Sequence, residues 1–311
     1  MAKKLTIGTR GSQLALWQAN WVKSELEKKH GIEVELEIIK TTGDKITDVP
    51  LAQVGGKGLF VKEIEEALLD GRVQLAVHSM KDVPTDFPDG LSLRCITERE
   101  DPRDIAITCT GNSFKDLPQG AHIGTSSLRR SSQLLDARPD FKIGQLRGNL
   151  DTRIRKVNDG EYDAIILAGA GIRRLGWADK ITDYFDTEFM LPAIGQGALG
   201  IETKTNDDET NALVDFFNHP DTSDAVRAER SLLKRLDGGC QVPIAAFGEI
   251  DGDNLRLRGL VAGVDGKNII KDEVSGSRSN AEAMGVELAE RLLKSGAYDI
   301  LKELYEVKPA D

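Results

Sequence analysis

The stretch Val73-Gln74-Leu75-Ala76-Val77-His78-Ser79-Met80-Lys81-Asp82-Val83-Pro84 decides the fold class of this chain of 311 residues. Its apolar first half predicts a buried strand, and polar residues follow directly where that strand ends. In open α/β sheets, ligands bind beyond the carboxyl ends of the strands. The stretch therefore predicts an α/β protein with a candidate site at residues 78–82. Asp82 is the acid best placed for catalysis, although an aspartate just before Pro84 is as often a turn former.

Strand and helix patterns alternate around this stretch. Residues 5–8 predict a short strand, and Ser12 can cap a helix whose apolar residues recur at helical spacing up to Gly31. Residues 32–38 alternate between apolar residues and glutamates, which predicts a strand with one solvated face. Residues 41–58 contain four glycines and few large apolar side chains, so we expect a mobile loop that could cover a cleft.

The chain then enters a second α/β unit and later returns to the first. Asp101-Pro102-Arg103-Asp104 interrupts the pattern as a hinge, and Pro192-Ala193-Ile194-Gly195-Gln196-Gly197 is the expected return crossing. Strands of the second unit are predicted at residues 105–108, 141–146 and 164–167. After Pro220 the order changes to a long amphipathic helix, three strands and two helices, predicted at residues 225–236, 244–250, 255–261, 268–274, 281–293 and 300–305. Strands followed by helices predict a small α+β domain.

Composition excludes several classes of protein. The chain has 41 Lys and Arg against 51 Asp and Glu, a formal net charge of −10, which argues against a nucleic-acid-binding protein. Arg10 interrupts the N-terminal apolar run before a signal-peptide core can form, and no apolar run approaches the roughly 18 residues that a membrane span requires. We therefore expect a cytoplasmic protein without nucleic-acid or membrane partners.

Cysteine and histidine usage favours neither a metal site nor a disulfide framework. The 3 cysteines are widely spaced without a Cys-x-x-Cys pair, and the 4 histidines lack metal-like spacing. Cys240 differs from the other cysteines, because two glycines precede it and Pro243 follows it in a turn between a helical and a strand-like segment. A buried cysteine is the ordinary interpretation of such a residue, but this turn favours a displayed, reactive sulfur.

Arginines gather in residues 129–156, where six arginines and two lysines stand against three aspartates. Gly124-Thr125-Ser126-Ser127 predicts a helix start whose backbone N–H groups and hydroxyls suit an anion, and Asn149 can cap a second such helix. Arg129 and Arg130 in the first turn conflict with the positive end of the helix dipole, and a bound anion would relieve that conflict. With the displayed thiol, the cluster suggests a covalently held polyanionic group. Arginines that are solvated or paired with local acids are the alternative.

Eight ordered motifs together resemble the hydroxymethylbilane synthase family, also called porphobilinogen deaminase. They are Thr9-Arg10-x-Ser12-x-Leu14-Ala15 with Gln18, Val54-Gly55-Gly56-Lys57-Gly58-Leu59-Phe60, Ala76-Val77-His78-Ser79-Met80-Lys81-Asp82-Val83-Pro84, Glu98-Arg99-Glu100-Asp101-Pro102-Arg103-Asp104, Gly124-Thr125-Ser126-Ser127-Leu128-Arg129-Arg130, Leu146-Arg147-Gly148-Asn149, Pro192-x-x-Gly195-Gln196-Gly197 and Gly238-Gly239-Cys240-Gln241-Val242-Pro243. The resemblance spans most of the chain.

The resemblance implies two α/β domains, each similar to type-II periplasmic binding proteins, around a cleft, and a smaller C-terminal α+β domain that carries the cysteine. The expected boundaries are residues 1–98 with 194–218 for a discontinuous first domain, 99–193 for an arginine-rich second domain, and 219–311 for the third.

The resemblance also implies a transferase of porphyrin (tetrapyrrole and heme) biosynthesis. A dipyrromethane cofactor, self-assembled from substrate, would be attached to Cys240 through a thioether. Porphobilinogen units would be added one at a time, each losing ammonia, until a linear tetrapyrrole is released by hydrolysis. Asp82 would be the catalytic carboxylate beside the pyrrole N–H groups.

The remaining site residues are carried over by position. Each pyrrole has an acetate and a propionate, which arginine forks suit. The cofactor contacts would be Lys81, Asp82, Thr125, Ser127, Arg129, Arg130, Arg147, Gly148 and Asn149. The substrate contacts would be Arg10, Ser12, Lys57, Arg147, Arg153, Arg174 and Gln196.

One departure from the family pattern and two other classes of function stay open. The family often has a lysine where this chain has Gln53, so no lysine contact is carried over there. The main alternative is a non-catalytic two-lobed protein that binds a small polycarboxylate and leaves Cys240 idle. A regulatory nucleic-acid binder conflicts with the net charge. A monomer is expected, since no heptad or large apolar stripe is left over.

Overall fold

The computed structural model describes residues 4–45, 61–238 and 242–306. Contacts within the chain divide it into two compact units. Unit 1 holds the described residues up to Glu100 together with Gly197–Ser223. Unit 2 holds Asp101–Gln196 together with the described residues from Asp224 onward. Among the described residues, the chain therefore leaves the first unit after Glu100, returns to it at Gly197 and leaves it again after Ser223.

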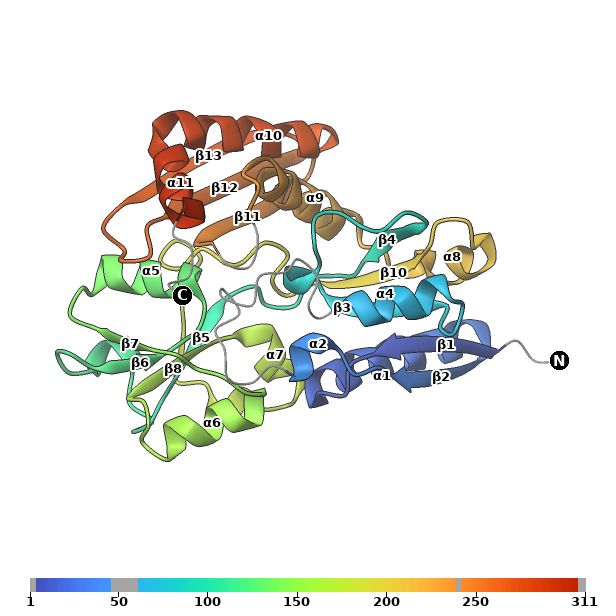
Figure 1. Ribbon diagram of the computed structural model, residues 1–311, viewed down its shortest axis with the longest axis horizontal. Coiled ribbons are helices and arrows are strands. Elements are labelled where there is room, and N and C mark those ends of the chain that lie inside the picture. Colours follow the sequence, from blue (N-terminus) through green and yellow to red (C-terminus); the bar gives the residue numbers. More distant parts are fainter. Residues whose placement is uncertain (1–3, 46–60, 239–241, 307–311) are drawn as a thin grey trace. The chain divides into compact units, whose positions relative to one another are not determined.

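Unit 1 is built on a five-stranded mixed sheet (Figure 1). Its order is β2 (Glu33–Ile38), β1 (Lys4–Thr9), β3 (Leu75–Ser79), β10 (Leu199–Lys204) and β4 (Leu91–Ile96). Strand β1 is parallel to β2 and β3, whereas β10 is antiparallel to β3 and β4. The carboxyl ends of β1, β2 and β3 therefore meet at one edge of the sheet.

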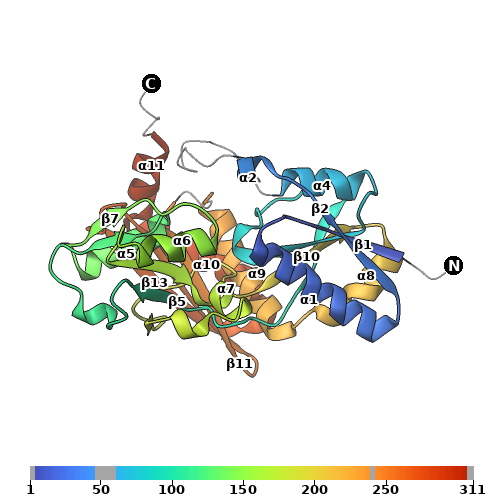
Figure 2. The same ribbon diagram turned by 90° about the horizontal axis from the view of Figure 1, so that it is seen from below.

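Helices cover both faces of this sheet, α1 (Gln13–His30) on one and α4 (Lys62–Leu69) on the other (Figure 2). The ends of α1 lie where the sequence predicts them, because the Ser12 side chain accepts a hydrogen bond from the Ala15 N–H, and Gly31 closes the helix in the left-handed region with φ 63°. Leu75 and Val77 of β3 point toward α1, and Ala76 between them points toward α4. Because side chains alternate along a strand, His78 lies on the same face as Ala76.

The first sheet of unit 2 repeats the same order and the same strand directions. It consists of β7 (Lys142–Gly144), β6 (His122–Gly124), β8 (Ala164–Ala168), β5 (Asp104–Thr108) and β9 (Asp183–Tyr184), with only β5 antiparallel to β8 and β9. Its helices are α5 (Leu128–Ala137), α6 (Leu150–Asn158) and α7 (Gly169–Arg174). Each of the two sheets has one strand that is antiparallel to its neighbours, β10 in unit 1 and β5 in the first sheet of unit 2. Strand β5 follows the point where the chain enters unit 2, and β10 follows the point where it returns to unit 1.

A third sheet completes unit 2. It is the antiparallel array β11 (Ile244–Asp251), β12 (Asn254–Ala262) and β13 (Ile269–Ser277), with α9 (Pro220–Arg235), α10 (Ala281–Leu292) and α11 (Tyr298–Glu306). The three helices cover one face (Figure 1). Leu191 packs on the other face with Ala245, Phe247 and Leu260. The expected fold class, two α/β sheets and a smaller α+β part, is confirmed.

The shorter elements complete the chain. They are α2 (Thr42–Lys45), α8 (Asp208–Val214), the 3₁₀ turns η1 (Met80–Asp82), η2 (Phe114–Asp116), η3 (Ala178–Lys180), η4 (Asp215–Phe217) and η5 (Arg278–Asn280), and the π turn η6 (Leu293–Ala297). The patterns did not predict β4, β6, β9 or β10, and β7 is shorter than the expected strand 141–146. Most of the loop expected at residues 41–58 lies outside the described residues. None of the described helices has the length and apolarity that crossing a bilayer requires.

Candidate functional site

The candidate site of unit 1 lies beyond the carboxyl ends of β1 and β3. Arg10 and Ser12 follow β1, and Asp82 follows β3 on η1, so the parallel strands bring the three residues to one edge of the sheet. They line a pocket of about 80 Å³, whose walls are Arg10, Ser12, Leu14, Ala15, Gln18, Val61, Ile64, Val77, His78, Ser79 and Asp82.

Hydrogen bonds fix the walls of this pocket. The buried Gln18 of α1 donates from Nε2 to the Ser79 hydroxyl at 2.9 Å, which ties the helix to the end of β3. Asp82 is exposed and Lys81 is half-buried, since the tight turn of η1 points them away from the core. The carboxylate that the sequence singles out is thus presented at the surface of the pocket.

A buried polar cluster adjoins the pocket through His78. The imidazole Nε2 of His78 lies 2.8 Å from Oε2 of Glu202 on β10, and both side chains are almost fully buried. Glu65 of α4 is buried on the same side of the sheet. Its burial, and then the negative charge of Glu202, raise the pKa of Glu65 to about 7, while His78 acts in the opposite direction. The sequence patterns missed this cluster, because β10 was not predicted.

Unit 2 repeats the arrangement at the carboxyl ends of β6 and β7. Thr125 and Ser127 follow β6, and Arg147 and Asn149 precede α6 after β7. Strands β6 and β7 are parallel, so these residues share one edge of the sheet. Ser127 and Asn149 occupy the N-cap positions of α5 and α6, yet neither side chain makes a capping hydrogen bond. Both helices begin where the sequence predicts. The side chains of Ser127 and Asn149 do not cap them.

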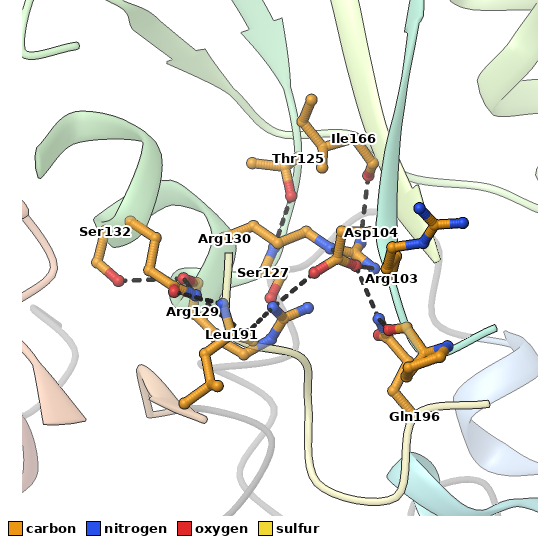
Figure 3. Close-up of polar contacts among 12 residues, drawn as sticks. Arg103, Asp104, Thr125, Ser127, Arg129, Arg130, Ser132, Ile166, Leu191 and Gln196 are labelled. Carbon is orange, nitrogen blue, oxygen red and sulfur yellow. Dashed lines mark hydrogen bonds and ion pairs between the residues drawn. The ribbon is translucent and has the colours of Figure 1, made fainter. Parts of the chain in front are cut away.

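Arg129 and Arg130 bind a carboxylate of the protein itself (Figure 3). Asp104 is fully buried and accepts from Arg129 Nη1 at 2.7 Å, from Arg130 Nε at 2.9 Å and Nη2 at 2.7 Å, and from Gln196 Nε2 at 3.0 Å. Arg129 and Arg130 also donate to the carbonyl oxygens of Leu191 and Ile166. Burial alone would raise the pKa of Asp104, but the charges of the two arginines lower it well below its usual range.

This cluster corrects one step of the sequence argument. We expected a bound anion to relieve the conflict between the two arginines and the dipole of α5, and Asp104 supplies that negative charge from β5. The count of charges in residues 129–156 did not include Asp104, because Asp104 lies 25 residues before Arg129 in the sequence. The two arginines and one aspartate still leave one positive charge in the cluster.

The other arginines differ in their partners. Arg138 is paired with Asp140, both of them half-buried, and Arg153 donates from Nε to the Gly148 carbonyl at 2.8 Å. Arg147 is half-buried and makes no ion pair or hydrogen bond among the described residues. Burial lowers the pKa of Arg147, and no carboxylate opposes that effect. Arg147 is therefore the cation of this edge best suited to an external carboxylate.

The remaining predicted site residues have mixed positions. Gln196 is buried, and its Nε2 also donates to the Pro102 carbonyl at 2.7 Å, so it belongs to the Asp104 cluster. Arg174 lies half-buried at the end of α7. Cys240 and Lys57 lie outside the described residues, as does Gln53. Within the described ranges, His, Cys, Asp and Glu side chains form no group of three suited to a metal ion.

Comparison with known proteins identifies the family. The family model described as "Porphobilinogen deaminase, dipyromethane cofactor binding domain" matches residues 5–212, and "Porphobilinogen deaminase, C-terminal domain" matches residues 224–294. The porphobilinogen deaminases of Geotalea uraniireducens (strain Rf4) and Geobacter metallireducens (strain ATCC 53774 / DSM 7210 / GS-15) are each 62% identical to this chain over 305 residues, covering 98% of it and 96% of each relative. Among solved structures, the methionine binding protein MetQ aligns with a TM-score of 0.44 at 15% identity, covering 68% of this chain and 89% of that one. This chain belongs to the porphobilinogen deaminase family.

Proposed function

We propose that this protein is a hydroxymethylbilane synthase, a transferase that joins porphobilinogen units into a linear tetrapyrrole and releases it by hydrolysis. Family membership along nearly the whole chain carries the proposal. The geometry supports it, because a reaction between acidic pyrroles needs cations for the carboxylates and a carboxylate for the reacting rings. Unit 2 has the arginines suited to the carboxylates, and unit 1 has the carboxylate of Asp82.

The residues of unit 2 fit a covalently bound dipyrromethane. When attached to Cys240 through a thioether, this group supplies the ring carbon from which the chain of pyrroles grows. Arg147 fits one of its carboxylates, since it is half-buried without an acid among the described residues. Thr125, Ser127 and Asn149 add a hydroxyl or an amide at the same sheet edge. Arg129, Arg130 and Gly148 complete the proposed cofactor contacts, with Lys81 and Asp82 from unit 1.

In unit 1 we propose that Asp82 stabilises the positive charge that develops on a pyrrole when ammonia leaves. Arg10 and Ser12 would bind a carboxylate of the incoming substrate at the same pocket. Arg153, Arg174, Gln196 and Lys57 are the further substrate contacts proposed. Gln196 would act through the Asp104 cluster, where its Nε2 donates to Asp104 and to the Pro102 carbonyl.

The domain organisation and cellular context are proposals of the same kind. We propose that residues 1–98 with 194–218, residues 99–193 and residues 219–311 are three domains, consistent with one sheet in each. We further propose a cytoplasmic monomer that has neither nucleic-acid nor membrane partners, in keeping with the net charge of −10.

The intact mass of the purified protein tests the proposed function. We expect a mass above that of the sequence by one two-pyrrole adduct, which Cys240→Ser abolishes. Cys109→Ser is the matched control, since Cys109 is an exposed thiol, and it should keep the adduct. An adduct that survives Cys240→Ser would overturn the assignment of Cys240. A bare mass, together with reversible polycarboxylate binding and no tetrapyrrole formed from porphobilinogen, would favour the non-catalytic binding protein.

A further inference from the structure

The cluster of His78, Glu202 and Glu65 adjoins the pocket of unit 1 through His78 and has no role in the function proposed above. We propose that His78 is a second catalytic residue of this pocket, which accepts the proton that a pyrrole carbon loses when a new unit is joined to it, and that Glu202 is its positioning residue. This inference rests on the proposed function and adds to it the site of one proton transfer.

The register of the sheet places the pair. Gly200 of β10 lies opposite His78 of β3, so Glu202, two residues further, lies on the same face as the imidazole. A side chain at position 200 has no room, because a Cβ there would lie 2.5 Å from Sδ of Met80 and 2.6 Å from Cδ1 of Leu93. His78 and Glu202 are only 5% and 1% exposed at their side chains, and Nε2 and Oε2 are 2.8 Å apart.

This geometry selects one form of the imidazole. A buried carboxylate beside Nε2 favours the tautomer with the proton on Nε2, and it also stabilises the imidazolium that forms when the other nitrogen is protonated. Nδ1 then carries the lone pair. It makes no hydrogen bond among the described residues, and His78 is one of the residues that line the pocket with Ser79 and Asp82. A base held in this way by a carboxylate is the arrangement of a general base.

Several titratable side chains surround the ring. Glu202 on β10 and Glu65 on α4 face the cluster from two elements, and Asp82 on η1 and Arg10 after β1 lie around the pocket. Glu65 retains its proton up to near-neutral pH, because its pKa is raised to about 7. The Glu202 carboxylate lies 2.8 Å from Nε2, so a proton taken up at Nδ1 would form an imidazolium beside a buried acid.

The proton step balances as follows. Ammonia leaves the aminomethyl group of porphobilinogen with the electron pair of the C–N bond. The free α-carbon of the pyrrole at the growing end forms a C–C bond to the resulting methylene carbon. The hydrogen of that α-carbon then leaves as a proton to Nδ1 of His78, and the C–H electron pair restores the aromatic ring. The imidazolium passes its proton to the released ammonia or to water. Asp82 keeps its role of stabilising the cationic states.

Two kinetic measurements test the role of His78 in the adduct-bearing protein. His78→Asn should lower turnover by roughly 100-fold, the usual contribution of a general base. With porphobilinogen deuterated at its free α-carbon, the variant should have a larger primary isotope effect than the wild type, because proton removal becomes slow. His30→Asn is the matched control, since His30 lies in the same unit and bonds to the Leu213 carbonyl. It should change neither quantity. An isotope effect in His78→Asn equal to that of the wild type overturns the proposal.

A spectroscopic measurement tests the positioning role of Glu202 without relying on activity. Nitrogen chemical shifts of ¹⁵N-histidine in the protein report which ring nitrogen carries the proton, and the signals missing in His78→Asn assign the ring among the 4 histidines. We expect Nε2–H in the wild type and a loss of that preference in Glu202→Gln. Glu202→Gln should also slow turnover, but by no further factor in the background of His78→Asn. An unchanged tautomer overturns the role of Glu202.

Controls separate this inference from the proposed function. A wild type that lacks the adduct and forms no tetrapyrrole contradicts the proposed function itself. A wild type with both, beside a His78→Asn variant with the wild-type isotope effect, contradicts only the role of His78. If His78→Asn loses its cooperative melting transition, Glu202→Gln decides the question, because it keeps the shape of the side chain.

Discussion

At the scale of single residues, the same residue type has different roles according to its nearest acid. Arg129 and Arg130 are buried and share Asp104, Arg138 is paired with Asp140, and Arg147 has no acid among the described residues. The sequence predicts an arginine-rich site and singles out Arg129, Arg130 and Arg147, while Arg138 enters only through the count of arginines. The sequence does not predict which of these arginines are paired within the protein. Asp104, which binds Arg129 and Arg130, lies on β5 and is far from them in the sequence.

Arg147→Met should lower kcat/KM for porphobilinogen by at least about 10-fold and leave the free energy of unfolding unchanged or higher. A lost charge-assisted contact to a carboxylate corresponds to roughly 1.5–3 kcal/mol. The folded protein loses no internal partner, and a half-buried cation with a lowered pKa is removed. Arg138→Met is the control for the kinetics, since Arg138 is already paired with Asp140, and it should change kcat/KM little. A large loss of stability with normal kinetics would assign Arg147 a structural role instead. Steady-state kinetics and urea unfolding measure the two quantities.

At the scale of elements, strong local signals predicted the structure and weak ones did not. The cap at Ser12, the left-handed Gly31 and the long helices and strands after Pro220 are confirmed. The strand predicted from the alternation at residues 32–38 is present as β2, but Ile38 at its end is exposed. Strand β6 has three residues and β9 two, too short for any periodicity. Strand β10 ends in polar residues, of which Glu202 and Thr203 are buried by the elements packed on the two faces of the sheet. Burial of that kind is a property of the assembled sheet, so the cluster with Glu65 could not be predicted from the sequence.

The buried Glu65 on α4 should make stability fall as the pH rises toward neutrality. Its pKa is raised from 4.5 to about 7 in the folded protein, so between these values the native state holds a proton that the unfolded chain has released. This stabilisation is fully present below about pH 4.5 and is lost as the pH rises through 7, in total roughly 3 kcal/mol.

Glu65→Gln removes this titration. The free energy of unfolding of the wild type, measured in urea at pH 5 and pH 8, should therefore fall by about 2 kcal/mol more than that of Glu65→Gln. Glu66→Gln changes an exposed residue of the same helix and should follow the wild type. Parallel pH profiles for the wild type and Glu65→Gln would contradict the buried, protonated state of Glu65.

At the scale of the whole molecule, unit 2 contains two sheets that are formed by separate segments of the chain. Leu191 links them, because its backbone carbonyl accepts from Arg129 and from Gln133, while its side chain packs against Phe247 and Leu260 of the third sheet. Arg258 of β12 adds hydrogen bonds to the Thr187 hydroxyl and to Glu188. The site at the edge of β6 and β7 is thus held on one side by contacts that lead to the third sheet.

Leu191→Ala should weaken both sheets of unit 2 together. The substitution removes only the side chain, which is 7% exposed, and a buried leucine cut to alanine costs about 2–5 kcal/mol. Amide hydrogen exchange should accelerate in β8 and in β12 by similar factors, at least about 30-fold if 2 kcal/mol is lost from the opening that both strands share. Leu288→Ala is the control, since Leu288 is buried on the helix-covered face of the third sheet. It should accelerate β12 more than β8. Acceleration confined to β12 in Leu191→Ala would mean that the two sheets open independently. In that case the proposed second and third domains would be separate in energy as well as in sequence, and contacts with the third sheet would not stabilise the arginine site.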